Sequence, residues 1–309
     1  MIMKVVTIIL MILLISFSFY YLYDNIPLNP TKLSVEGVID DPEDFINYGE
    51  TPMFAENIRF SKNEVSYYID DSCPISRTLK MGEAFNIIEG SVNGLSFSEV
   101  IDRNSAEVYV GCSDEEIEVD TNLFAVGEGG PTKVIKVGKF NLIEEGRIHL
   151  YKDSKCDYPV TEVHELLHVL GFDHSENPNS ILYDTYSCDQ RITPDIIKIL
   201  NELYSIEPLP DLKIKNLEVV KKGRYLDFNV TIVNEGMSDV GVVELVLLSE
   251  EKEISNFLLN DIYKGYARTL TVQNLRMFSS NINVIDFYID YSNKISEIDE
   301  GNNQVRAFS

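Results

Sequence analysis

The chain has 309 residues, 44% of them hydrophobic and 25% charged, a composition typical of globular domains and not of a disordered protein. Acidic residues outnumber basic ones by 50 to 26, so the formal net charge is −24, and this argues against nucleic acid as a partner because a phosphate backbone would be repelled. We interpret the acidity as solvation of a secreted surface, with a specific cationic partner as the alternative.

The first segment predicts a membrane anchor. From Val5 to Tyr23 only one threonine and two serines interrupt an apolar run without charges. A helix of this length spans about 28 Å, close to the thickness of the hydrocarbon core. We expect a single-pass anchor at residues 1–23 in the cell membrane, with the rest of the chain extracellular. The alternative is a cleaved signal peptide, which would make the protein secreted.

Residues 24–61 are rich in Asp, Glu, Asn and Pro and have little periodicity, so we expect a stalk, or alternatively a short pro-segment. A first domain is then predicted at residues 62–207. Its expected strands are 64–70, 95–100, 107–111, 133–137 and 147–152, and its expected helices are 74–90, 159–170 and a last one that begins at Thr193-Pro194. Residues 127–131 are expected to form a glycine-rich loop.

Residues 206–211 have the composition of a stiff linker, and the pattern changes after them. About seven short alternating segments follow, without a helix signal. This predicts an immunoglobulin-like β-sandwich at residues 208–309, so the fold class is α+β followed by all-β.

A candidate metal site lies between His164 and His174. His164 and His168 are four residues apart, so in a helix both imidazoles point to the same side. Gly171 can end that helix, and the chain can then bring His174 to the same ion. Three neutral imidazoles with an open fourth position are typical of a catalytic zinc site.

Glu165 is next to the first histidine and is the candidate catalytic residue. Because it is one position further round the helix than His164, its side chain does not bind the metal but lies near a zinc-activated water. It would accept a proton from this water and pass it to the leaving amine. The alternative, histidines that merely pack in a buried helix, does not account for the spacing. The fourth histidine, His149, is interpreted as an ordinary residue of a strand.

The segment His164–His174 resembles the metzincin motif H-E-x-x-H-x-x-G-x-x-H. Phe172-Asp173-His174-Ser175, together with Pro178 and Tyr183, is similar to the matrixin branch. The resemblance implies a mixed sheet, about three helices and a cleft along an edge strand, with one catalytic Zn²⁺ and a protein or peptide substrate. Specificity is then expected from a wall at residues 184–192.

Three features depart from the matrixin pattern. Leu182 occupies the place of the methionine that lies under the ligands. His149 alone cannot supply the further histidines of the family's structural zinc site. No segment resembles P-R-C-G-x-P-D, so latency through a cysteine on the metal has no support.

The four cysteines are widely spaced, which suits disulfide bonds in an exported protein. A bond between Cys156 and Cys188 would flank the site, with Cys73 and Cys112 as the second pair. Three pairings are open, and free buried thiols are the alternative.

Residues 211–309 resemble CARDB domains, through Val233-Asn234-Glu235-Gly236 and the segment Ile298–Asn303. The resemblance implies a spacer, or a module that binds a surface or polymer. Calcium at Asp299 and Glu300 is an alternative to a solvated loop.

The sequence therefore predicts a zinc metalloendopeptidase. The competing hypotheses are a non-enzymatic surface adhesin that keeps the protease fold, and a hydrolase of a non-protein amide. The intact Glu165 argues against the adhesin, since a chain that has lost catalysis has no need for a general base.

Overall fold

The computed structural model describes residues 2–25, 30–37, 51–115, 117–120, 123–153 and 155–308. The chain divides into two compact units. One unit consists of Pro42–Leu209, and the other combines Met1–Asp41 with Pro210–Ser309.

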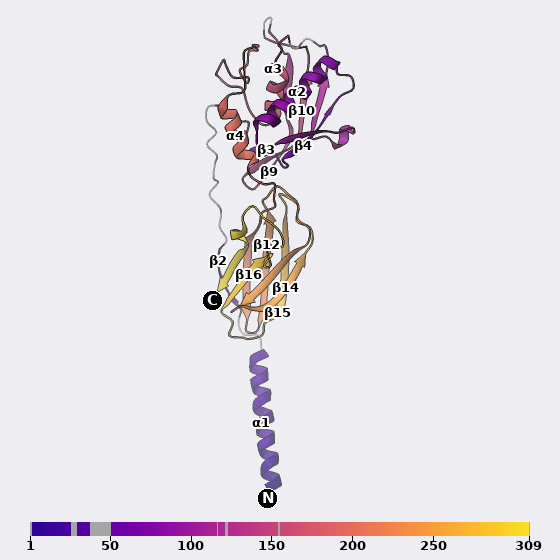
Figure 1. Ribbon diagram of the computed structural model, residues 1–309. Helices are drawn as coiled ribbons and strands as arrows, with labels where there is room; N and C mark the ends of the chain where they lie inside the picture. Colours follow the sequence, from indigo (N-terminus) through magenta and orange to yellow (C-terminus); the bar gives the residue numbers. More distant parts are fainter. Residues whose placement is uncertain are drawn as a thin grey trace. The chain divides into compact units, whose positions relative to one another are not determined.

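The Pro42–Leu209 unit is built on a mixed six-stranded sheet (Figure 1). Its strands are β3 (Ile58–Phe60), β4 (Glu64–Ile69), β5 (Ser96–Glu99), β6 (Val108–Cys112), β9 (Gly127–Val137) and β10 (Phe140–Leu150). Five strands pair in the order β3-β10-β6-β4-β5, all parallel, and β9 pairs antiparallel along β10. A short hairpin of β7 (Glu118–Asp120) and β8 (Leu123–Phe124) precedes β9. The mixed sheet implied by the matrixin resemblance is confirmed.

The glycine-rich segment was predicted wrongly. Residues 127–131 begin the edge strand β9 and are not a loop, and Gly127 and Gly129 pair with Leu150 and Ile148 of β10. Glycine weakens a strand by itself, so a local pattern favours a loop here. Pairing with β10 overrides that preference, because it satisfies the backbone hydrogen bonds of this segment.

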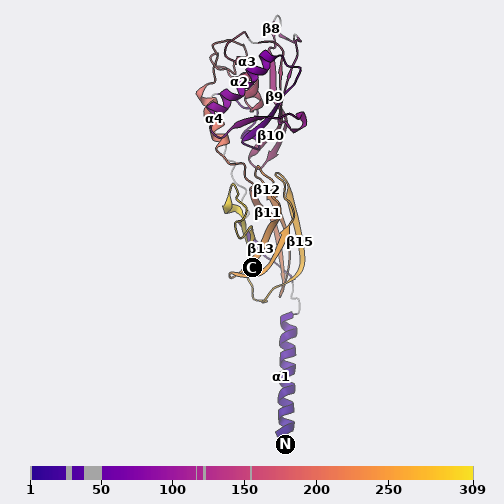
Figure 2. The same cartoon turned by 45° about the vertical axis from the view of Figure 1, so that its right-hand side comes forward.

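Three helices complete this unit, as expected: α2 (Ile75–Ser91), α3 (Val160–Val169) and α4 (Pro194–Tyr204). A 3-10 turn, η1, spans Arg103–Ser105. Helices α2 and α3 lie together against one face of the sheet (Figures 1 and 2). The core between them contains Phe85 of α2, Leu166 of α3 and Ile148 of β10. This core holds the helix of the metal motif firmly against the sheet.

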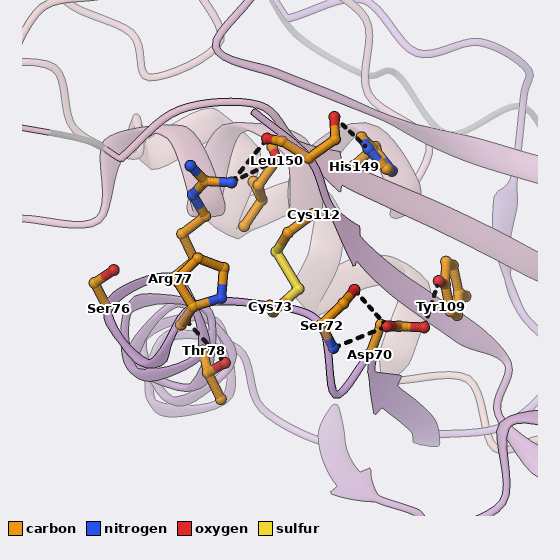
Figure 3. Close-up of a disulfide and its surroundings, with 12 residues drawn as sticks. Asp70, Ser72, Cys73, Ser76, Arg77, Thr78, Tyr109, Cys112, His149 and Leu150 are labelled. Atoms are coloured by element: carbon orange, nitrogen blue, oxygen red, sulfur yellow. Dashed lines mark hydrogen bonds between the residues drawn. A yellow bond between two sulfur atoms is a disulfide. The ribbon is translucent and has the colours of Figure 1, made fainter. Parts of the chain in front are cut away.

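A disulfide and a buried arginine join the start of α2 to the sheet (Figure 3). Cys73 is bonded to Cys112 at the end of β6. Arg77 is 5% exposed, donates to the carbonyl oxygen of Leu150 and forms ion pairs with Asp114 at 2.6 Å and Asp153 at 2.9 Å. A buried guanidinium is stable only when paired, so these contacts fix the start of α2.

The second unit contains a two-sheet sandwich, as predicted. Its main strands are β11 (Leu212–Lys222), β12 (Tyr225–Asn234), β13 (Val243–Ser249), β14 (Lys252–Leu259), β15 (Ala267–Arg276), β16 (Val284–Ile289) and β17 (Gln304–Phe308), with a 3-10 turn η2 (Glu300–Asn302). The sheets have the orders β1-β11-β12-β15 and β14-β13-β16-β17-β2. Alternate side chains fill the core between them, Phe228 and Phe287 among others.

Both sheets include a strand from the predicted stalk. Strand β1 (Thr31–Lys32) pairs with β11, and β2 (Ser34–Glu36) pairs with β17. Leu33 between them is 3% exposed in the sandwich core. This part of the 24–61 segment is therefore an integral part of the sandwich, and β3 at its other end belongs to the first unit. The rest of the segment that lies at residues 26–29 and 38–50 is outside the described residues.

Helix α1 spans Ile2–Asn25, where the sequence predicts an anchor at residues 1–23. In the described part of the chain, no helix meets the length and apolarity needed to cross a membrane.

Candidate metal centre and substrate cleft

Helix α3 brings two histidines to the same side. His164 and His168 lie one turn apart, with their Nε2 atoms 2.9 Å from each other. His168 is 6% exposed. The periodicity of an α-helix is sufficient to produce this arrangement, as the sequence predicted.

Backbone carbonyls determine the tautomers of both rings. Nδ1 of His164 lies 2.6 Å from the carbonyl oxygen of Ile181, and Nδ1 of His168 lies 2.8 Å from that of Phe172. A carbonyl oxygen can only accept, so each Nδ1 carries the proton and each Nε2 presents a lone pair. Histidines that bind metals are commonly oriented in this way.

Burial keeps both rings neutral. It lowers the pKa of His164 to about 3, with a further contribution from His168, and it also lowers the pKa of His168. Two bare Nε2 lone pairs at 2.9 Å repel each other unless a cation lies between them. The donor set therefore fits a metal ion.

The third histidine arrives through a turn. Gly171 has a φ of 100°, a left-handed conformation that ends α3 and that glycine adopts without strain. A Cβ at this position would also collide with the side chain of Ile58. His174 follows, and one ligand atom from each of His164, His168 and His174 lies within 4.8 Å of the others. The structure thus brings together all three predicted ligands.

Glu165 lies beside the histidines and is 5% exposed. Burial, with the carboxylates of Glu128 and Glu162 nearby, raises the pKa of Glu165 to about 8. A cation at the histidines would favour the ionised form and lower this pKa. The carboxyl group is therefore suited to exchange a proton near neutral pH.

Two glycines of β9 let the strand approach Glu165 closely. A Cβ at Gly127 would lie 2.8 Å from Oε1 of Glu165, and one at Gly129 would collide with the carbonyl oxygen of Glu165. This role of the two glycines was not predicted from the sequence. The signal is the spacing of two residues, because alternate strand residues point to the same face.

Leu182 occupies the chain position expected for the family's methionine, next to the residue whose carbonyl oxygen contacts His164. It is fully buried, and its carbonyl oxygen accepts from the backbone N–H of Ser175 at 2.8 Å. Its neighbour Ile181 supplies the carbonyl that orients His164. An apolar side chain of similar volume to methionine is therefore buried at this position, and its effect on the site stays a prediction.

A cleft of about 500 Å³ contains the three histidines and Glu165. One wall is formed by residues 125–129, which include the start of β9, and another by the segment from Tyr183 to Tyr186 together with Gln190. Apart from Tyr183, this second wall falls within the predicted 184–192 segment. Phe54, which the sequence analysis did not identify, stacks on the ring of His168 at 6.0 Å between centroids.

A second disulfide ties the Tyr183–Gln190 wall to the residues before α3. Cys156 is bonded to Cys188, so both predicted pairings are present and no cysteine in the described residues is free. The hydroxyl of Tyr186 lies 2.5 Å from Sγ of Cys156. The disulfide therefore positions one wall of the cleft.

The remaining candidates lie outside the centre. His149 contacts Ser113 at 3.1 Å and lines a separate cavity, which agrees with its interpretation as an ordinary strand residue. Asp299 accepts from the backbone N–H of Gly301, and Glu300 accepts from that of Glu297, as in a hydrogen-bonded loop.

Comparison with known proteins identifies both units. Residues 59–205 match the Matrixin family, and residues 209–307 match the CARDB family. No curated protein matches the chain.

Among solved structures, the chain is similar to a domain of a cell surface protein from Methanosarcina acetivorans, with 16% identity and a TM-score of 0.28 over 33% of this chain and 91% of that one. It is also similar to a CARDB domain from Pyrococcus furiosus, solved in complex with di-metal ions, with 16% identity and a TM-score of 0.27 over 33% of this chain and 88% of that one. The two family matches by themselves assign a matrixin domain, from a family of metalloproteases, to residues 59–205 and a CARDB domain to residues 209–307.

Proposed function

We propose that this protein is a zinc-dependent endopeptidase that cleaves polypeptides outside the cytoplasm. The observation that carries the proposal is the convergence of His164, His168 and His174 within 4.8 Å. Two of these rings have Nδ1 engaged by backbone carbonyls, and buried Glu165 lies beside them. Neutral imidazole nitrogens are ligands that Zn²⁺ prefers, and three of them leave a fourth position open for catalysis.

When bound at the histidines, Zn²⁺ supplies Lewis acidity that activates water and polarises a peptide carbonyl. The protein residues do the rest. The carboxylate of Glu165 accepts a proton from the attacking water and then delivers it to the leaving nitrogen. Ile181 and Phe172 hold the ligand rings in one tautomer, so no proton competes for Nε2.

The substrate is proposed to be an extended polypeptide. Strand β9 pairs only with β10 among the described strands, so one of its edges has backbone groups available. An extended peptide can add to such an edge through main-chain hydrogen bonds. The beginning of β9 at Gly127 lies against Glu165, so a peptide bound there would pass directly over the metal centre.

The test is digestion of a peptide library by the full-length protein, with zinc content measured by mass spectrometry. We expect one zinc per chain, cleavage by the wild type, and loss of cleavage after chelation. Glu165→Gln should retain zinc but lose at least about 100-fold in kcat/KM, the typical contribution of a general base. Glu176→Gln, the same change on an exposed loop, is the control.

Two outcomes would contradict this function. Cleavage by Glu165→Gln at the wild-type rate would exclude the mechanism. A zinc-loaded wild type that cleaves no peptide would favour the non-enzymatic adhesin.

The extracellular location is part of the proposal. The disulfides Cys73–Cys112 and Cys156–Cys188 support it, because such bonds persist in oxidising compartments and are rare in the cytosol. Thiol labelling of the protein in intact and lysed cells, followed by fractionation, tests it. Four free thiols on a cytoplasmic protein would contradict it.

A further inference from the structure

The cleft has an uneven distribution of charge. Four carboxylates line it, namely Glu128, Glu165, Asp173 and Asp184, and no lysine or arginine appears among its described lining residues. With one divalent cation at the histidines, the carboxylates still exceed the positive charge by two. The cleft is therefore negative whether or not the metal is bound.

Two of these carboxylates have no cation of their own. The Asp184 side chain is exposed and accepts only from Thr185, and Glu128 accepts from the hydroxyl of Tyr151 at 2.9 Å. Neither forms an ion pair with a described lysine or arginine. Elsewhere in this unit, carboxylates with cationic partners are common, as in Glu107 with Lys62 at 3.1 Å.

Glu128 and Asp184 also come from different walls. Glu128 belongs to the edge strand β9, and Asp184 belongs to the disulfide-tethered segment that ends at Cys188. A peptide lying across the metal centre would pass both. Arg147 lines the neighbouring cavity together with Glu128, so the charge of Glu128 is partly balanced and that of Asp184 is not.

We propose that this cleft selects polypeptides with lysine or arginine close to the scissile bond, with Asp184 as the main specificity determinant and Glu128 as the weaker one. This inference rests on the proposed peptidase function and names its substrate class. A basic side chain reaching either wall gains an ion pair that no residue of the protein supplies. An acidic side chain meets uncompensated negative charge.

The test uses matched peptides that differ only by Lys, Gln or Glu at one position near the cleaved bond. With the full-length wild type we expect kcat/KM to be highest for the Lys peptide, lower for the Gln peptide and lowest for the Glu peptide. Each of the two differences should be roughly two- to fivefold, the size typical of exposed ion pairs. Salt at 1 M should reduce these differences, because it screens charges beyond about 3 Å.

Four variants locate the effect. Asp184→Asn should remove most of the preference at the affected position, and Glu128→Gln should remove less. Asp189→Asn is the first control, because Asp189 directly follows Cys188 and is outside the cleft lining. Glu115→Gln is the second, because Glu115 lines the neighbouring cavity together with Arg147 and is also outside the cleft lining. Both controls should keep the wild-type preference.

Binding separates this inference from the proposed function. The affinity of fluorescent forms of the same peptides is measured with the Glu165→Gln variant, which is expected not to cleave them. This measurement of binding does not depend on catalysis. Tighter binding of the Lys peptide, lost in the Asp184→Asn double variant, supports the inference even if catalysis fails. Equal binding and equal cleavage of the three peptides, or an equal effect of Asp189→Asn and Asp184→Asn, would overturn it.

Discussion

The Nδ1 atom of His164 and the carbonyl oxygen of Ile181 form a hydrogen bond of 2.6 Å. This bond joins helix α3 to Ile181, which is seventeen residues further along the chain and directly precedes Leu182. The backbone N–H of Ile181 in turn donates to the carbonyl oxygen of Arg191 at 2.8 Å. Hydrogen bonds through Ile181 therefore connect the candidate ligand His164 to the segment that forms one wall of the cleft.

The fully buried Leu182 allows a direct test of the departure from the family. Leu182→Met restores the family residue with little change in volume, so we expect the free energy of unfolding to change by less than about 1.5 kcal/mol. Leu182→Ala leaves a cavity and should cost about 2–5 kcal/mol. Thermal unfolding and zinc affinity measure both effects. If Leu182→Ala bound zinc as tightly as the wild type, Leu182 would have no role in supporting the site.

The close approach of β9 to α3 predicts a contrast between neighbouring glycines. Gly129→Ala should push the strand away from Glu165, lowering stability by about 1–3 kcal/mol and reducing kcat/KM. Gly130→Ala is the control, because a Cβ there meets nothing within 4 Å. Urea unfolding and peptide cleavage provide the measurements. Equal effects of the two changes would contradict the packing described for Glu165.

The two disulfides should differ in their effect on substrate binding. Replacing Cys156 and Cys188 by serine opens a loop closed over a separation of 32 residues and should cost about 3–4 kcal/mol. It should also raise KM, because Tyr186 and Gln190 lose their tether. Replacing Cys73 and Cys112 should cost a similar free energy without raising KM, since that bond lies away from the cleft. A rise in KM in both variants would indicate a general loss of order instead.

Glu297 predicts a pH dependence of stability in the sandwich. Burial raises its pKa from 4.5 to about 7, so the folded state binds more protons than the unfolded state between these values. Stability therefore falls as the pH rises from about 4.5 to about 7. Glu297→Gln should remove this dependence and stabilise the domain at pH 7.5. In the wild type, Glu297 accepts from the backbone N–H of Leu212 and from Nδ2 of Asn303. The amide of the variant keeps the first contact, and it can donate to Oδ1 of Asn303, which has no partner, once the Asn303 amide turns over.

Differential scanning calorimetry of the full-length protein at pH 5 and pH 7.5 measures this effect. The comparison should show a transition that shifts with pH in the wild type and shifts less in Glu297→Gln. Glu253→Gln is the control, because Glu253 is an exposed residue of β14. An identical pH shift in both variants would place the titrating group elsewhere.

The elements that local patterns specify were predicted well. Hydrophobic periodicity located α2, α3, α4 and the sandwich strands, since each of these elements buries one face. Two predictions failed where distant contacts override local preference. Residues 127–131 became a strand because β10 lies alongside, and β1 and β2 joined the sandwich although their own sequence has little periodicity.

The sequence by itself determined which residues are the candidate metal ligands and which is the candidate general base. His164, Glu165 and His168 share one helix and His174 follows one glycine-permitted turn, so their grouping depends only on local backbone geometry. The tertiary structure decided the tautomer of His164, the burial of Glu165 under Gly127 and Gly129, the pairing of the cysteines and the charged walls of the cleft. These depend on segments far apart in the chain, and a local sequence pattern carries no information about which of them meet.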